Sequence, residues 1–419
     1  MAGGCRAVGR GGRVSAPGED RAVLEPGPAE DRGVLQPVLA GVMSSLVGFA
    51  SSFAVVLAGL RAVGADAGQA ASGLLVLCVG MGATAIVLSR RRRLPLNIAW
   101  STPGAALLIA AGPVHGGYPA ALGAFLAAGL LTVLAGLWRP LGRWIAAIPA
   151  PLANALLAGV LLSVCVAPVR GVTELPWLTL PVVVTWAVLG RVARRWAVPG
   201  ALVAAAVAIA VDGALAPGAA DHPLPTLTAT LPVLDVRTLV GVGLPLFLVT
   251  MASQNLAGMS VLRLHGYDPE LRPILLSTGA VSVLGAPFGA HAINLAAITA
   301  GLTAGPDAHP DPGRRWIATV AGGVAYLVLG ISAGLVTAVI AASPPVVIEA
   351  VAGLALLGAL AAALGAATAD PAQRDAAIVT FVVSASGLTL AGISAPFWGL
   401  VAGLALLALA RRARPQTAS

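Results

Sequence analysis

One histidine lies where it could exchange protons in the middle of an apolar stretch. Of the five His residues, only His291 is far from loops and from other charged side chains. An ionisable group at such depth in a membrane is costly and usually functional, and imidazole titrates closest to neutral pH. The few acids near apolar stretches, Asp212 and Glu349, lie at their edges. We predict that His291 binds a ligand and carries a proton. A structural histidine bonded to a backbone carbonyl is the alternative.

Polar residues beside a proline indicate a helix that begins inside an apolar stretch. Within residues 94–112, Thr102 has the properties of an N-cap, with Pro103 at the first helical position. A helix start presents unpaired backbone N–H groups and a positive dipole, which favour an anion. We therefore predict that Ser101, Thr102 and Gly104 bind one. A simple proline kink without a ligand is the alternative.

The stretch Ala286–Thr299 has a similar pattern. Gly289 and Ala290 near its start predict a second half-helix. His291 and Asn294, three residues apart, would then lie on one face of its first turn. We expect the two half-helices to face each other, so that both N-termini point at the same ligand.

Three consecutive polar residues, Ser253, Gln254 and Asn255, interrupt another apolar stretch. Each is costly in hydrocarbon unless it finds a hydrogen-bond partner. Bonds between helices would satisfy them, but three together favour a polar cavity, and we predict that Gln254 and Asn255 contact the ligand. Phe53, which lies among several Ser residues, offers an aromatic surface, although Ser also permits close helix packing.

Enzyme motifs are weak in this sequence. Ser332 lies in a G-x-S-x-G match, but that motif requires a turn between a strand and a helix, and the same residues match a helix-packing pattern. The sequence has no Lys, which excludes a phosphate-binding loop ending in G-K-[ST], and its three Cys residues lack metal-ligand spacing. We predict no catalytic residue, no metal and no cofactor. A membrane-embedded hydrolase using Ser332 and a passive channel are the alternatives.

The composition places these residues in a lipid bilayer. Of the 419 residues, 58% are hydrophobic and 10% are charged, with a net charge of +8. A soluble domain has about 25% charged residues, so this chain cannot cover a surface in water. Its Arg residues form short clusters between apolar stretches, which argues against nucleic acid as a partner. We predict an all-α polytopic membrane protein.

The apolar stretches predict about 14 membrane spans. We place them at 35–60, 70–88, 94–112, 118–137, 146–166, 177–190, 197–216, 239–262, 273–286, 287–303, 316–340, 345–365, 376–393 and 396–410. Together they form one membrane domain at 34–410. It follows a disordered cytoplasmic tail at 1–33 and precedes a short cytoplasmic tail at 411–419.

The basic residues, all of them Arg, set the orientation. With the N-terminus inside, 22 of the 25 fall in cytoplasmic segments, as the positive-inside rule requires, and the remainder are Arg61, Arg170 and Arg237. Both termini are then cytoplasmic.

The long external segment at 217–238 divides the spans into halves at 35–216 and 239–410. Seven spans in each half give the halves opposite orientations, an inverted repeat that is common in secondary transporters. We expect spans 3 and 10, which contain the proline and glycine patterns described above, to be broken half-helices.

Four strings of residues, Trp100–Leu108, Thr250–Met259, Ala286–Thr299 and Gly305–Pro312, resemble those of one family. This is the BenE family of bacterial benzoate transporters, and the likeness runs in order and spacing over nearly all of 35–410. The resemblance implies a benzoate/proton symporter of the bacterial inner membrane that works by alternating access. It also implies a distant relation to nucleobase and sulfate permeases, which have two inverted seven-span repeats.

In that wider fold the substrate lies between spans 3 and 10, while span 8 adds side chains and span 1 closes the site. The resemblance places around the ligand the residues Ser101, Thr102, Gly104, Gln254, Asn255, His291 and Asn294, with Phe53 from span 1. Nucleobase permeases have acids in spans 8 and 10, whereas this chain has amides and a histidine, which suits an anion. Another aromatic acid or a nucleobase-like compound is the alternative substrate. Because related folds often dimerise, a homodimer is a further expectation.

Overall fold

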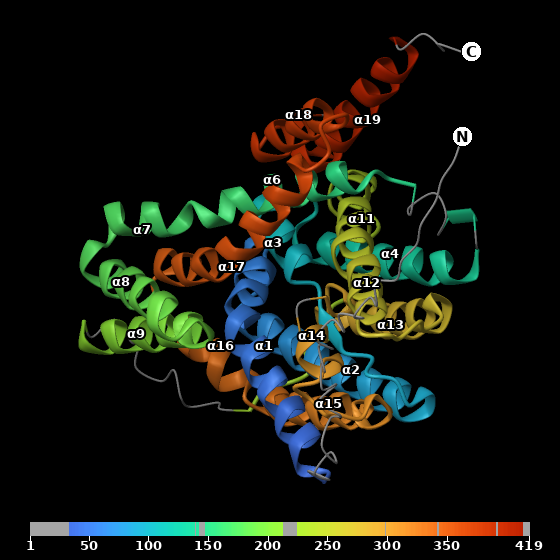
Figure 1. Ribbon diagram of the computed structural model, residues 1–419. Coiled ribbons are helices and arrows are strands. Elements are labelled where there is room, and N and C mark those ends of the chain that lie inside the picture. The colour runs from blue at the N-terminus through green and yellow to red at the C-terminus, as the bar shows by residue number, and fades with distance from the viewer. Residues whose placement is uncertain are drawn as a thin grey trace, which may run out of the picture.

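The computed structural model describes residues 33–138, 140–141, 147–212, 224–297, 299–341, 343–390 and 393–413. The expected N-terminal tail lies outside these ranges except for Gly33, and so does the expected C-terminal tail beyond residue 413. Figure 1 shows that the described chain is a bundle of helices that cross at varied angles.

The helices of the first half are α1 (Leu35–Ala62), α2 (Ala67–Arg92), α3 (Thr102–Ala111), α4 (Gly117–Leu137), α6 (Ala150–Cys165), α7 (Ala167–Glu174), α8 (Pro176–Val192) and α9 (Ala197–Val211). Those of the second half are α10 (Val236–Thr238), α11 (Leu244–Thr250), α12 (Ala257–Leu264), α13 (Leu271–Gly285), α14 (Ala300–Ala304), α15 (Trp316–Ile331), α16 (Ala333–Ala341), α17 (Pro345–Thr368), α18 (Arg374–Ala385) and α19 (Ala395–Ala413). Two π-helical segments, η2 (Leu239–Gly243) and η3 (Met251–Leu256), join α10, α11 and α12 into one helical run.

Within the described ranges, seven helical runs are long and apolar enough to cross a membrane. Four shorter apolar helices, α3, α8, α9 and α19, accompany them. The predicted all-α polytopic membrane fold is therefore confirmed.

The two halves pack in an interchanged pattern. Helix α2 packs against α15, and α4 packs against α13. In span order these are spans 2 and 11 and spans 4 and 9, so each contact maps onto the other when the halves are exchanged. The pairs α8 with α9 and α18 with α19 match in the same way. An inverted repeat produces this relation.

Glycines let the paired helices approach closely. A Cβ on Gly82 of α2 would lie 2.6 Å from the carbonyl oxygen of Gly323 in α15. In the matching pair, a Cβ on Gly279 of α13 would lie 2.8 Å from the backbone nitrogen of Val133 and 3.1 Å from the carbonyl oxygen of Gly129, both in α4. Small residues at helix crossings are typical of membrane proteins, so these glycines fix the spacing of both pairs.

Two short strands interrupt spans 3 and 10. Strand β1 (Ile98–Trp100) pairs with β2 (Ile293–Leu295) in antiparallel register, with Ala99 opposite Asn294. Each strand is followed by a short helix, α3 or α14. Non-helical backbone at membrane depth is tolerated where protein buries it, and β2 is buried along its whole length. The predicted breaks in spans 3 and 10 are thus confirmed.

The remaining helices form a second group. Helix α17 packs on α6 and α7, and α18 packs on α6 and α19. We call α6–α9 and α17–α19 the outer helices, and α1–α4 and α10–α16 the central helices. Figure 1 shows α7, α8, α9 and α17 gathered on one side of α1, with α18 and α19 at the top of the view. A strand pair, β3 (Thr389–Leu390) and β4 (Ile393–Ser394), lies between α18 and α19. The two groups meet where α17 contacts α1 and α6 contacts α3.

Candidate functional site

Ser101 joins three spans at the centre of the molecule. Its backbone N–H donates to the carbonyl of Ala292 (3.1 Å), and its own carbonyl accepts from Nε2 of His291 (2.9 Å). Its hydroxyl is hydrogen-bonded to the hydroxyl of Thr250, with 2.9 Å between the oxygens. Ser101 is fully buried, and these direct hydrogen bonds connect spans 3, 8 and 10.

Helix α3 is capped one residue earlier than the sequence predicts. Ser101, not Thr102, is the N-cap, because its backbone is extended and its Oγ accepts a hydrogen bond from the N–H of Gly104 (3.1 Å). Pro103 therefore lies second in the helix, where its missing N–H would have had no helical partner. Thr102 becomes the first helical residue. Its half-buried side chain makes no hydrogen bond with the described part of the chain.

Gly104 has a packing role in this conformation. A Cβ at this position would lie 2.5 Å from Cδ1 of Leu246 in α11 and 2.8 Å from Oγ of Ser101. The N–H that we expected to meet an anion is already used by the cap. Gly104 thus allows α3 and α11 to approach each other.

The predicted half-helix beginning at Ala290 is wrong. The chain turns at Gly289 (φ 97°), continues through strand β2, and becomes helical only at Ala300. His291 and Asn294 therefore do not share a helix face, and no helix N-terminus lies at His291. The reason is the pairing with β1, which satisfies backbone groups across the two spans.

His291 is fully buried, with its ring held on two sides. Nε2 bonds the carbonyl of Ser101, and the ring of Phe125 from α4 meets it edge-on, with 6.2 Å between centroids. Nδ1 is buried and has no hydrogen-bond partner among the residues that the structure describes. Because buried polar atoms are nearly always bonded, Nδ1 is a place where a ligand or a proton could bind.

Asn294 is likewise buried with one unpaired polar atom. It is fully buried, and its Nδ2 donates to the carbonyl of Leu295 (2.9 Å), while its Oδ1 has no partner in the described part of the chain. The segment that contains β2 therefore holds two unpaired buried polar atoms, one on each of the residues singled out from the sequence.

The polar triplet of span 8 lies within the π-helical segment η3. Such segments often mark functional sites. Asn255 accepts a hydrogen bond at Oδ1 from the N–H of Leu295 (3.0 Å), and its Nδ2 contacts Sδ of Met251 (3.4 Å). Ser253 bonds the carbonyl of Val249 in its own helical run (2.6 Å). Gln254 is only 6% exposed and makes no side-chain hydrogen bond within the described ranges. Of the three, Gln254 is thus available to a ligand.

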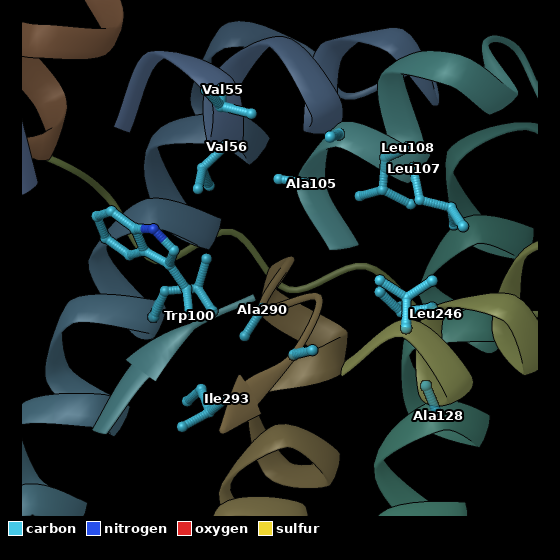
Figure 2. Close-up of a cluster of buried hydrophobic side chains, with 14 of the residues drawn as sticks. Val55, Val56, Trp100, Ala105, Leu107, Leu108, Ala128, Leu246, Ala290 and Ile293 are labelled. Atoms are coloured by element: carbon cyan, nitrogen blue, oxygen red, sulfur yellow. The ribbon is translucent and has the colours of Figure 1, made fainter. Parts of the chain in front are cut away.

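An aromatic cluster adjoins the broken spans. Phe53 stacks on Phe49 with 5.2 Å between centroids, Phe49 lies 5.8 Å from Trp100, and Trp100 lies 6.3 Å from Tyr326. The indole N–H of Trp100 donates to the hydroxyl of Ser52 (3.0 Å). Figure 2 shows the neighbouring apolar side chains, which come from α1, α3, α4, α11 and the segment around Ala290.

Sequence reasoning missed three residues that shape the site, namely Thr250, Phe125 and Trp100. Thr250 precedes Gln254 by one helical turn, so its spacing could have revealed it. Phe125 is one aromatic residue in an apolar helix, and its contact with His291 carries no local signal.

The hydrolase alternative gains no support from the surroundings of Ser332. The hydroxyl of Ser332 bonds the carbonyl of Leu329 in its own turn (2.6 Å). Across the residues that the structure describes, no group of three or more His, Cys, Asp or Glu side chains is placed to hold a metal ion.

Solved structures share this fold. The transmembrane domain of the cyanobacterium bicarbonate transporter BicA matches with a TM-score of 0.59 at 16% identity, over 89% of this chain and 98% of that one. The structure of SLC26A9 matches with a TM-score of 0.60 at 15% identity, over 89% of this chain and 65% of that one. At these identities the likeness is one of fold.

Sequence relatives are closer. The inner membrane protein YdcO of Escherichia coli (strain K12) is 36% identical over 366 residues, which are 87% of this chain and 93% of the relative. The benzoate membrane transport protein of Acinetobacter baylyi (strain ATCC 33305 / BD413 / ADP1) is 29% identical, with the same coverage of both chains. The family model for BenE, described as benzoate membrane transport protein, matches residues 34–409. The chain therefore belongs to the BenE family and is a multi-pass membrane transporter.

Proposed function

We propose that this transporter imports benzoate across the bacterial inner membrane together with a proton, by alternating access. Membership of the BenE family and the names of the two relatives support benzoate as the substrate and the inner membrane as the location. The distribution of Arg residues supports cytoplasmic termini. The observation that carries the proton coupling is the unpaired Nδ1 of His291.

The hydrogen bonding of His291 leaves one ring nitrogen for proton exchange. A backbone carbonyl only accepts, so Nε2 must carry hydrogen to bond Ser101. The neutral ring then has a lone pair on Nδ1. A carboxylate also only accepts, and it can bond Nδ1 only after that atom is protonated.

This requirement makes anion and proton binding cooperative. A lone imidazolium or a lone carboxylate is costly in an apolar interior, whereas together they form a charge-assisted hydrogen bond. Arg315, the one Arg that is buried in the described part of the chain, already donates to the carbonyls of His309 and Ala304. His291 is therefore the group that we assign to proton transfer.

The remaining roles follow from which atoms are already bonded. Thr102 and Gln254 have free donors for the carboxylate. The Oδ1 atom of Asn294 accepts a hydrogen bond, either from a water molecule bound to the ligand or from the protonated ligand. Ser101, Gly104 and Asn255 shape the site through their existing contacts. The aromatic cluster that includes Phe53 packs against the ring of the substrate.

Uptake of labelled benzoate into proteoliposomes tests the coupling. With the membrane potential clamped, an inward proton gradient should drive accumulation above the equilibrium level. Protein-free liposomes under the same gradient measure the passive entry of neutral benzoic acid. Uptake that does not depend on the proton gradient would contradict proton symport. Uptake that does not saturate with benzoate concentration would indicate a channel.

A His291→Gln variant tests the residue. The glutamine amide can still donate to the Ser101 carbonyl but cannot take up a proton. We expect the variant to bind or exchange benzoate weakly and to lose gradient-driven accumulation. Coupling equal to that of the wild type would contradict the role of His291.

A further inference from the structure

Two hydroxyl groups meet at the start of α3. The oxygens of Ser101 and Thr250 are 2.9 Å apart, and the two residues are 0% and 2% exposed. The N–H of Gly104 donates to the Ser101 hydroxyl as well. The pair thus links the N-terminus of α3 to the end of α11, next to the π-helical segment that contains Gln254.

Counting hydrogens shows that this pair has one donor left over. Each hydroxyl has a single hydrogen, and only one of the two can lie between the oxygens. The Gly104 N–H occupies a lone pair of Ser101 and uses neither hydrogen. Within the described residues neither hydroxyl has another acceptor. One O–H is therefore buried without a partner, whichever of the two donates to the other.

A spare donor is what a carboxylate ligand needs here. The two unpaired buried atoms beside strand β2, Nδ1 of neutral His291 and Oδ1 of Asn294, are acceptors, and a carboxylate cannot bond an acceptor. Ser101, one of the two residues that share the spare donor, also bonds His291 through its carbonyl. The unpaired donor and the protonatable nitrogen thus belong to one bonded network.

We propose that Thr250 is a substrate-positioning residue, whose hydroxyl, paired with that of Ser101, makes one O–H available to the carboxylate of the substrate. The inference rests on the proposed transport of benzoate. Thr250 acts by orienting Ser101 or by donating directly, and in either case removing its hydroxyl changes the donor offered to the ligand. With Val at this position, Ser101 keeps its cap contact with Gly104 but loses its hydroxyl partner.

Saturable benzoate uptake by three variants tests the proposal. Thr250→Val removes the hydroxyl at nearly constant shape, and Thr250→Ser restores it. Thr132→Val is the control, because Thr132 of α4 is also buried but bonds only the carbonyl of Ala128 in its own helix (2.9 Å). Thr250→Ala replaces Thr250→Val if the latter does not reach the membrane.

We expect Thr250→Val to raise the KM for benzoate about 10-fold or more, the size of one lost bond to a charged group, with Vmax within about twofold of the wild type. Thr250→Ser and Thr132→Val should keep KM within about threefold. A residue that only supports α3 would lower Vmax and thermal stability without this selective change in KM.

Three results would overturn the proposal. They are a KM in Thr250→Val equal to that of the control, a Thr250→Ser variant as impaired as Thr250→Val, and a loss of Vmax alone. A wild-type protein without saturable benzoate uptake would instead refute the proposed function, and the inference would fall with it.

Discussion

Gln254 and Asn255 are adjacent in the sequence, yet their amide groups have different surroundings. Asn255 is bonded to the backbone of β2, whereas Gln254 has no partner within the described ranges. The sequence predicts that both need partners, because a polar group in hydrocarbon does. It cannot predict which of the two amides forms a hydrogen bond within the protein, because that depends on a strand 40 residues away.

The two amides should therefore respond differently to removal. Asn255→Leu leaves the buried N–H of Leu295 unpaired, which should lower the free energy of unfolding by about 1–3 kcal/mol. Gln254→Leu should leave stability nearly unchanged and raise the KM for benzoate. Thermal unfolding in detergent and initial uptake rates measure the two effects. Equal losses of stability would contradict the assignment.

The same limit explains why the sequence does not show how His291 is bonded. Its depth and isolation are visible in the sequence and correctly predict a buried polar group. Its hydrogen bond to Ser101 spans 190 positions, so local spacing could not show that the ring is fixed at Nε2 and unpaired at Nδ1.

Among the elements, the two broken spans were predictable because proline, glycine and capping residues act locally. The strand pair between them was not. Strands of three residues are too short for an alternating pattern, and each forms only because the other is present. That pairing is also why the second half-helix starts at Ala300 instead of Ala290.

Helix α10, which opens span 8, begins at a cap that should make stability depend on pH. The Asp235 carboxylate accepts from the backbone N–H and the hydroxyl of Thr238 (both 2.9 Å) and lies 3.1 Å from Nδ1 of His115. The hydrogen bond from the Thr238 N–H, followed by that from its hydroxyl and the contact with His115, lowers the pKa of Asp235.

Because the folded pKa is lower than the unfolded one, the stabilisation is present above about pH 4, the unfolded value. It is lost as the pH falls through the folded pKa. An Asp235→Asn variant should therefore lose less thermal stability than the wild type between about pH 5 and about pH 3. Parallel curves of melting temperature against pH for the two proteins would show that the cap does not contribute to the pH dependence of stability. High salt should weaken only the part due to His115.

For the whole molecule, the side chains that we assign to the ligand all come from the central helices and strands. The outer helices meet this group through α17 on α1 and α6 on α3, within a continuous cluster of buried apolar side chains. His291 and Asn294 are fully buried in this conformation. A ligand can therefore reach these residues only after a conformational change, and we propose that the two groups of helices move relative to each other.

The fold was more predictable than the site because hydropathy and Arg placement are sums over many residues. Such sums tolerate local exceptions. Arg315 counts as one of the cytoplasmic cations, yet it is 7% exposed and holds the loop after α14 through the carbonyls of Ala304 and His309. Orientation in the membrane and a homodimer stay predictions.

The most direct test of the account is whether benzoate binding takes up a proton at His291. Benzoate added to the purified wild-type protein in weakly buffered solution near neutral pH should raise the pH of the medium, with about one proton bound per occupied site. His291→Gln, given enough benzoate to fill its site, should show no such change. Proton uptake of equal size in both proteins would contradict the account.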